Sequence, residues 1–106
     1  MDLLTRSEEL LLLAVWRLQE DAYGAAIRDQ LSAKTGKDWA IGSVYGPLDR
    51  LAKRGLLNTF VGSPTPERGG RSKRCYKLTR EGVGALTHTR QVTNLFWSDL
   101  QDFSLV

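Results

Sequence analysis

The chain has 106 residues and a net charge of +3, with 42% hydrophobic and 25% charged residues, a composition typical of one globular domain. Its longest apolar run, residues 10–16, is far shorter than the roughly 20 residues of a transmembrane helix, and no basic segment precedes it as in a signal peptide. We therefore expect no membrane partner. Cys75 is the only cysteine, which excludes an intrachain disulfide and favours a cytoplasmic location.

Two helices are expected first along the chain. Thr5 and Glu8 have the spacing of a capping box, which predicts a helix over about residues 7–19. This helix is apolar on most sides, so we expect a partner chain to cover part of it. A second helix is expected over about residues 23–34, with Gly36 as its C-terminal stop.

A third helix is expected over about residues 43–54, with Ser43 as its N-cap. Its apolar stripe, which faces the core, is Val44, Leu48 and Leu51. Pro47 falls near the fourth helical position, so we expect a distorted first turn or a helix that begins after Ser43. The linker before this helix, about eight residues, is longer than the three or four of an ordinary helix-turn-helix.

A β-hairpin follows, with strands over residues 57–61 and 75–78 and a Gly-, Pro-, Ser- and Arg-rich loop between them. Thr79 begins a last helix whose apolar spacing is broken near Arg90. Helices followed by a hairpin predict an α+β domain. We expect a winged helix-turn-helix over residues 1–78, and a C-terminal dimerisation helix over 79–106 that completes one compact domain.

The last helix carries more apolar surface than one small domain can cover. We expect its aromatic residues at the centre of a homodimer, and Trp97 is also a candidate for stacking on a flat ligand. Trp16 and Trp39 are expected in the core or the interface. The predicted dimer interface consists of Leu11, Val15, Val92, Phe96, Trp97, Leu100 and Phe103.

Basic residues cluster in one part of the chain. Nine of the fifteen lysines and arginines lie between Arg50 and Arg80, where Glu67 is the only acid. Such clustering suits an anionic polymer, although a solvated basic surface is the plain alternative. An α-helix fits the major groove of DNA, and a basic hairpin tip can reach the neighbouring backbone. The predicted DNA contacts are Ser43, Tyr45, Arg50, Lys53, Arg54, Arg68, Arg71, Lys73 and Arg74.

Other roles have less support. Tyr45 could instead be a half-buried packing residue, and the helix cations could only solubilise the surface. His88 is the only histidine and no second ligand lies at metal-binding spacing, so we expect neither a metal nor another cofactor. Cys75 is interpreted as a small packed strand residue. No nucleophile–base pair and no phosphate-binding loop is present, so we expect no enzyme activity.

Several segments together resemble the PadR-like family of bacterial winged-helix regulators. They are AYGAAI at 22–27, GSVY at 42–45, LDRL at 48–51, KRGL at 53–56, ERGGR at 67–71, YKLT at 76–79 and EG at 81–82. The resemblance covers nearly the whole chain. It differs from the usual family pattern where Gly46 precedes Pro47, at Ala25 and at Ala52.

The resemblance implies a dimer in which the last helix packs across the partner's first helix. It also implies that Tyr45, its helix neighbours and the wing cations touch operator DNA. The short C-terminal part resembles the compact subgroup with a single final helix, some members of which stack flat ligands near the position of Trp97.

The sequence thus predicts a sequence-specific transcriptional repressor that binds a near-palindromic operator as a homodimer, with a small-molecule inducer as a further partner. The alternative is a winged-helix module that binds proteins or senses small molecules without binding DNA. Apolar residues in place of the cations of the third helix would favour that alternative. RNA binding has less support, because the wing lacks interleaved aromatic residues for stacking bases.

Overall fold

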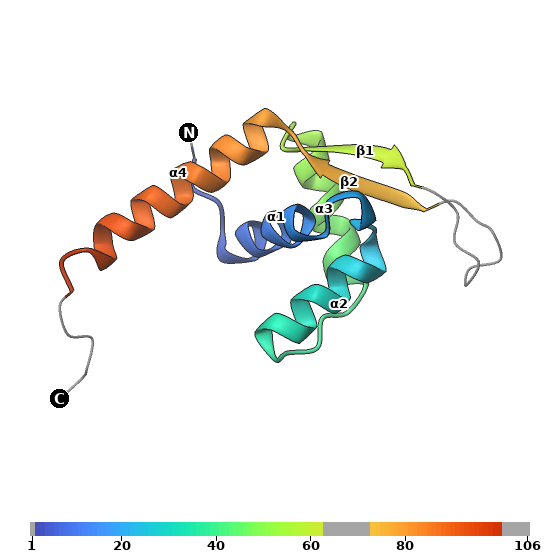
Figure 1. The fold of residues 1–106 in the computed structure, drawn as a ribbon, viewed down its shortest axis with the longest axis horizontal. Coiled ribbons are helices and arrows are strands. Elements are labelled where there is room, and N and C mark those ends of the chain that lie inside the picture. Colours follow the sequence, from blue (N-terminus) through green and yellow to red (C-terminus); the bar gives the residue numbers. More distant parts are fainter. Residues whose placement is uncertain (1, 63–72, 101–106) are drawn as a thin grey trace.

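A computed structural model describes residues 2–62 and 73–100. The elements are α1 (Arg6–Leu18), the 3₁₀ turn η1 (Gln19–Asp21), α2 (Gly24–Thr35), α3 (Gly42–Lys53), β1 (Leu57–Val61), β2 (Arg74–Leu78) and α4 (Arg80–Trp97). The three helices and the hairpin form a compact body, and α4 projects away from it, which makes the molecule 55 Å long and 20 Å thick (Figure 1). No helix in the described residues is both long and apolar enough to cross a membrane.

Capping interactions fix the ends of α1 and α2 as expected. The Thr5 hydroxyl accepts from the Glu8 amide at 3.1 Å, and the Glu8 carboxylate accepts from the Thr5 amide at 2.9 Å, which confirms the capping box. Gly36 follows α2 with a φ of 70°, a left-handed conformation that glycine adopts without steric cost.

The start of α3 differs from the expectation. The helix begins at Gly42, so Ser43 lies inside it and is not its N-cap; no side chain caps this end. The first turn is tight, because the amides of Ser43 and Val44 bond three residues back, to Ala40 and Ile41. This distortion precedes Pro47, which lies inside the helix and has no amide hydrogen to donate.

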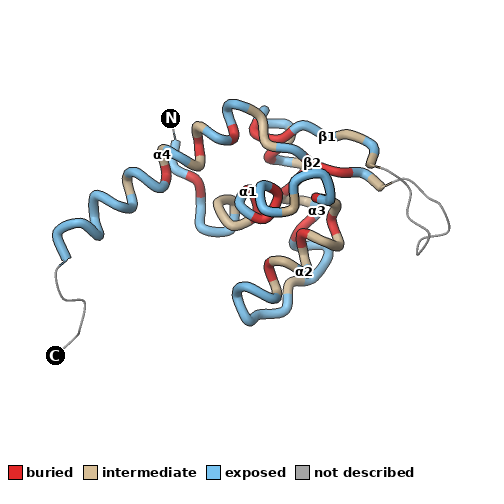
Figure 2. The backbone as a smooth tube through the Cα atoms, viewed as in Figure 1, coloured by how far each residue is buried: buried red, intermediate tan, exposed pale blue. Residues whose placement is uncertain are grey.

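The core lies between α1, α2, α3 and the hairpin. Val44, Leu48 and Leu51 are 0–1% exposed, which confirms the predicted stripe of α3. The strands pair antiparallel, with Leu57 opposite Leu78 and Asn58 opposite Lys77. Buried residues concentrate in this body, whereas the distal half of α4 is almost entirely exposed (Figure 2).

The N-terminal segment ties α4 to the body. The Leu4 amide donates to the Thr89 hydroxyl at 3.1 Å, and both residues are buried. At the start of α4, Thr79 accepts from the Gly82 amide and donates to the Gly55 carbonyl. A Cβ added to Gly82 would overlap the carbonyl oxygen of Leu56, so a residue that weakens an isolated helix is required here for close packing.

We therefore expect Gly82→Ala to lower the free energy of unfolding by about 1–3 kcal/mol, because the backbone of Leu56 must move. Urea denaturation measures this change. Gly42→Ala is the matched control, since a Cβ there meets no atom within 4 Å. Equal stabilities of the two variants would contradict the close approach.

Candidate nucleic-acid interface

The solvent-facing side of α3 carries four of the predicted contacts. Ser43, Tyr45, Arg50 and Lys53 are all exposed, opposite the buried stripe of the same helix. Their types suit a groove, because hydroxyl and cationic groups can meet phosphates and base edges.

Tyr45 is both packed against α2 and partly exposed. Its ring lies so close to Gly24, at the start of α2, that a Cβ on Gly24 would overlap the ring. Even so, Tyr45 remains 42% exposed. The ring therefore fixes the contact between α2 and α3 and also presents a surface to solvent.

A network of three side chains joins the hairpin of β1 and β2, which we call the wing, to α3. The Tyr76 ring is fully buried, and its hydroxyl donates to the Asp49 carboxylate at 3.2 Å. The same carboxylate oxygen pairs with the Arg74 guanidinium at 3.2 Å. Burial, reinforced by the nearby Asp49 charge, raises the pKa of Tyr76 to about 12, so its hydroxyl keeps the donated proton at neutral pH.

The cations at the base of the wing face the helix-turn-helix. Asp49, Lys53 and Arg74 line one shallow depression between α3 and the hairpin. The Lys73 ammonium lies 3.8 Å from the ring centroid of Tyr23, the N-cap of α2. The exposed side of α3 and the base of the wing are therefore neighbouring parts of one surface, which we call the basic face: Ser43, Tyr45, Arg50, Lys53, Lys73 and Arg74.

Arg54 forms an ion pair with α1. Its guanidinium pairs with the Glu8 carboxylate of α1 at 2.6 Å. Partial burial opposes ionisation of Glu8, but the Thr5 backbone hydrogen bond and the Arg54 charge outweigh it and keep the pKa of Glu8 below its ordinary value. Because Arg54 is held by α1, we leave it out of the surface that we propose for DNA.

The predicted interface residues divide into two groups. Phe96, Trp97 and Leu100 are 49–76% exposed on or just beyond α4, and Val92 is half-buried. In contrast, Leu11 and Val15 are 0% and 2% exposed in the core of their own chain, which leaves them no surface for a partner. The exposed apolar residues of α1 are instead Leu13 and Trp16. Trp39 packs at the edge of the core.

Three of the predicted residues lie outside the described part of the chain: Arg68, Arg71 and Phe103. The sequence interpretation missed Asp49, Tyr76 and Tyr23. Asp49 had a signal, since it is the only acid on α3. The roles of the two tyrosines depend on tertiary contacts, which the pattern of residues along the chain does not show.

Three helices followed by an antiparallel hairpin, with α2 and α3 packed through Tyr45, define a winged helix-turn-helix protein. The sequence pattern of the transcriptional regulator PadR-like family matches residues 12–88. The chain therefore belongs to the PadR-like family of transcriptional regulators.

Solved structures agree with this fold. The chain in the complex structure of hsRosR-S1 has 28% sequence identity to this chain. The TM-score is 0.67, and the match covers 91% of this chain and 78% of that one. A PadR family transcriptional regulator from Eggerthella lenta is 26% identical, with a TM-score of 0.67 over 88% and 79% of the two chains. A PadR-like transcription factor from Bacteroides fragilis is 22% identical, and its TM-score of 0.71 over 92% and 89% shows the shared fold. No curated protein matches the chain.

Proposed function

We propose that the protein binds duplex DNA as a homodimer and represses transcription from a near-palindromic operator. The observation that carries this proposal is the basic face, in which the exposed side of α3 and the base of the wing adjoin. In the proposed complex, α3 enters the major groove and the wing cations approach the flanking backbone. The proposal also includes Arg68 and Arg71, which lie outside the described residues, as DNA contacts.

The exposed apolar residues of α4 support the homodimer. Leu95, Phe96 and Trp97 are 52–76% exposed, and such a cluster on a soluble protein marks an interaction site. A second copy that covers these residues with its own α4 and with Leu13 of its α1 would pair the two basic faces and leave Trp16 outside the interface. If the dimer follows the usual geometry, its two α3 helices should lie about 34–36 Å apart, one turn of DNA.

Substitutions of the wing cations and substitutions in α3 should have different effects on DNA binding. We expect the triple change of Arg68, Arg71 and Lys73 to alanine to weaken binding to all duplexes alike and to reduce the salt dependence. Arg50→Ala should instead change the preference among sequences, by about 1–3 kcal/mol at the contacted base pair. Fluorescence anisotropy with a selected operator and with random duplex measures both effects.

Lys34→Ala is the control for these variants. Lys34 is an exposed cation in the last turn of α2, whereas the basic face adjoins the start of that helix. It should leave DNA affinity nearly unchanged. Identical changes in sequence preference from the helix and wing variants would contradict this division of roles. Loss of affinity by Lys34→Ala alone would place the DNA surface elsewhere.

Asp49 should weaken DNA binding in the unchanged protein, because it is an anion that partly neutralises Arg74 within the basic face. We expect Asp49→Asn to bind random duplex more tightly, with the slope of log affinity against log salt steeper by about 0.9 for each added phosphate contact. The asparagine oxygen can still accept from Tyr76, so the fold should persist. Asp29→Asn removes an equal charge from α2 as the control, and equal gains from both variants would reduce the effect to net charge.

A further inference from the structure

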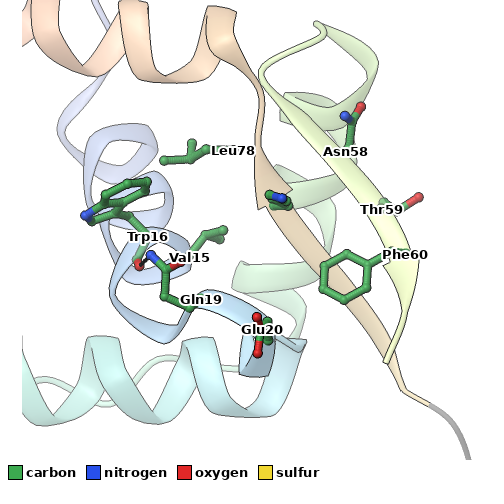
Figure 3. Close-up of a pocket in the computed structure, with 9 residues that line it drawn as sticks. Val15, Trp16, Gln19, Glu20, Asn58, Thr59, Phe60 and Leu78 are labelled. Carbon is green, nitrogen blue, oxygen red and sulfur yellow. Dashed lines mark hydrogen bonds between the residues drawn. The ribbon is translucent and has the colours of Figure 1, made fainter. Parts of the chain in front are cut away.

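A pocket of about 670 Å³ lies between the C-terminal end of α1, η1 and the hairpin (Figure 3). Its size falls in the range of sites that bind small molecules. Trp16 and Phe60 stand on opposite sides of it, and Leu78 contributes to its apolar wall. Trp16 is 56% exposed, so the indole is accessible to a planar ligand.

The two charged residues that line the pocket, Lys77 and Glu20, have opposite signs. At one end, Asn58 and Lys77 face each other across the two strands, where directly opposite side chains are neighbours. Both supply hydrogen-bond donors, one of them charged. Figure 3 places Glu20 at the other end, where its carboxylate is an acceptor. Gln19 lies next to it along the chain and also lines the pocket.

The conformation of Gln19 strengthens this polarity. Its side-chain amide donates one hydrogen to the Trp16 carbonyl at 2.6 Å, which fixes the orientation of the amide, and the amide oxygen is an acceptor. Gln19 has a φ of 53°, the only positive value for a non-glycine residue in the described ranges. Such strain costs about 1–3 kcal/mol and occurs preferentially at binding sites.

We propose that this pocket binds a planar aromatic zwitterion, a ring system that carries both a carboxylate and an ammonium group. The ring lies between Trp16 and Phe60, the carboxylate meets Lys77 and Asn58, and the ammonium meets Glu20. Neither Lys77 nor Glu20 forms an ion pair with another residue of the described segments. A ligand with a single charge would satisfy one of these groups and leave the other unmatched.

Three para-substituted benzene compounds test the proposal: 4-(aminomethyl)benzoate, which carries the two charges at opposite ends of the ring, 4-methylbenzylamine, which lacks the carboxylate, and 4-methylbenzoate, which lacks the ammonium group. Calorimetry on the full chain should show 4-(aminomethyl)benzoate binding about threefold to fivefold more tightly than either analogue, the effect of one exposed charge pair. In a ¹H–¹⁵N spectrum, the indole signal of Trp16 should shift, and those of Trp39 and Trp97 should not.

Charge variants give a sharper result. Lys77→Glu makes both ends of the pocket anionic and should reverse the preference toward 4-methylbenzylamine. Glu20→Lys makes both ends cationic and should reverse it toward 4-methylbenzoate. Both side chains are exposed, so the fold should tolerate these changes, which circular dichroism checks. The double variant should recover 4-(aminomethyl)benzoate binding, because this ligand can turn end to end.

Several outcomes would overturn the proposal. They are no saturable binding of any compound, binding that shifts Trp97 instead of Trp16, or an order of preference that both single variants leave unchanged. Phe60→Leu is a second test that spares the charges, and it should weaken all three compounds by up to about tenfold through loss of ring stacking.

The pocket shares β2 with the basic face, since Lys77 and Arg74 lie on this strand. The ligand is thus placed to act as an effector, an assignment that rests on the proposed function. Saturating 4-(aminomethyl)benzoate should change duplex affinity by more than about threefold in the parent protein and not in the Lys77→Glu variant. An unchanged affinity would overturn the effector role only, because ligand binding is measured without DNA.

Discussion

Raising the salt concentration from 50 to 200 mM should weaken duplex binding by about 10³- to 10⁵-fold, if the proposed dimer neutralises six to ten phosphates. In the proposed dimer, each protomer would contribute Arg50, Lys53, Lys73 and Arg74 of the basic face, together with Arg68 and Arg71, which lie outside the described residues. Counterions released from the DNA make such binding depend steeply on salt. Anisotropy titrations at four or more salt concentrations measure the slope.

The salt titration also separates the proposed function from its alternative. A winged-helix module that binds other proteins through α4 would show weak duplex binding at every salt concentration. A slope near zero with tight binding would remove the electrostatic mechanism even if the protein regulates transcription. The Asp49→Asn variant provides an internal check, because its slope should exceed that of the parent.

Replacing Leu11 by alanine should lower the free energy of unfolding by about 2–5 kcal/mol, because the side chain is fully buried and its loss leaves a cavity. Leu13→Ala removes the same atoms two residues away on the same helix, where the side chain is 39% exposed, and should cost less. Chemical denaturation measures both variants.

The same pair of variants tests the proposed dimer. Leu13→Ala should weaken self-association measured by sedimentation, whereas any effect of Leu11→Ala on association should follow from its lower stability. If Leu11→Ala instead dissociated the dimer without changing the free energy of unfolding, Leu11 would belong to the interface, as the sequence first indicated.

Local patterns in the sequence predicted the elements well. The capping box at Thr5, the stop at Gly36 and the stripe of α3 each depend on residues a few positions apart, and the structure confirms all three. The predicted start of α3 was wrong. Ser43 is a good N-cap by residue type, but the residues before it, including Ile41, already adopt a helical turn.

The remaining differences arise from contacts between distant parts of the chain. In the run of apolar residues at 10–16, no polar residue marks the outer side, so the core position of Leu11 and the exposed position of Leu13 could not be distinguished. Arg54 lies among cations in the sequence, but its partner Glu8 is 46 residues away. Predicting this pairing requires knowledge of how α1 crosses the end of α3.

Residues 4–8 contact both α4 and the end of α3. The Leu4 amide holds α4 through Thr89, and four residues later Glu8 holds the last turn of α3 through Arg54. In the proposed dimer, a rotation of one α4 relative to the α4 of the partner would therefore be transmitted to α3 through residues 4–8. Among proteins with this fold, the spacing of the operator half-sites should then depend on the length and stiffness of the segment that corresponds to residues 4–8. The residues that touch bases should affect this spacing less.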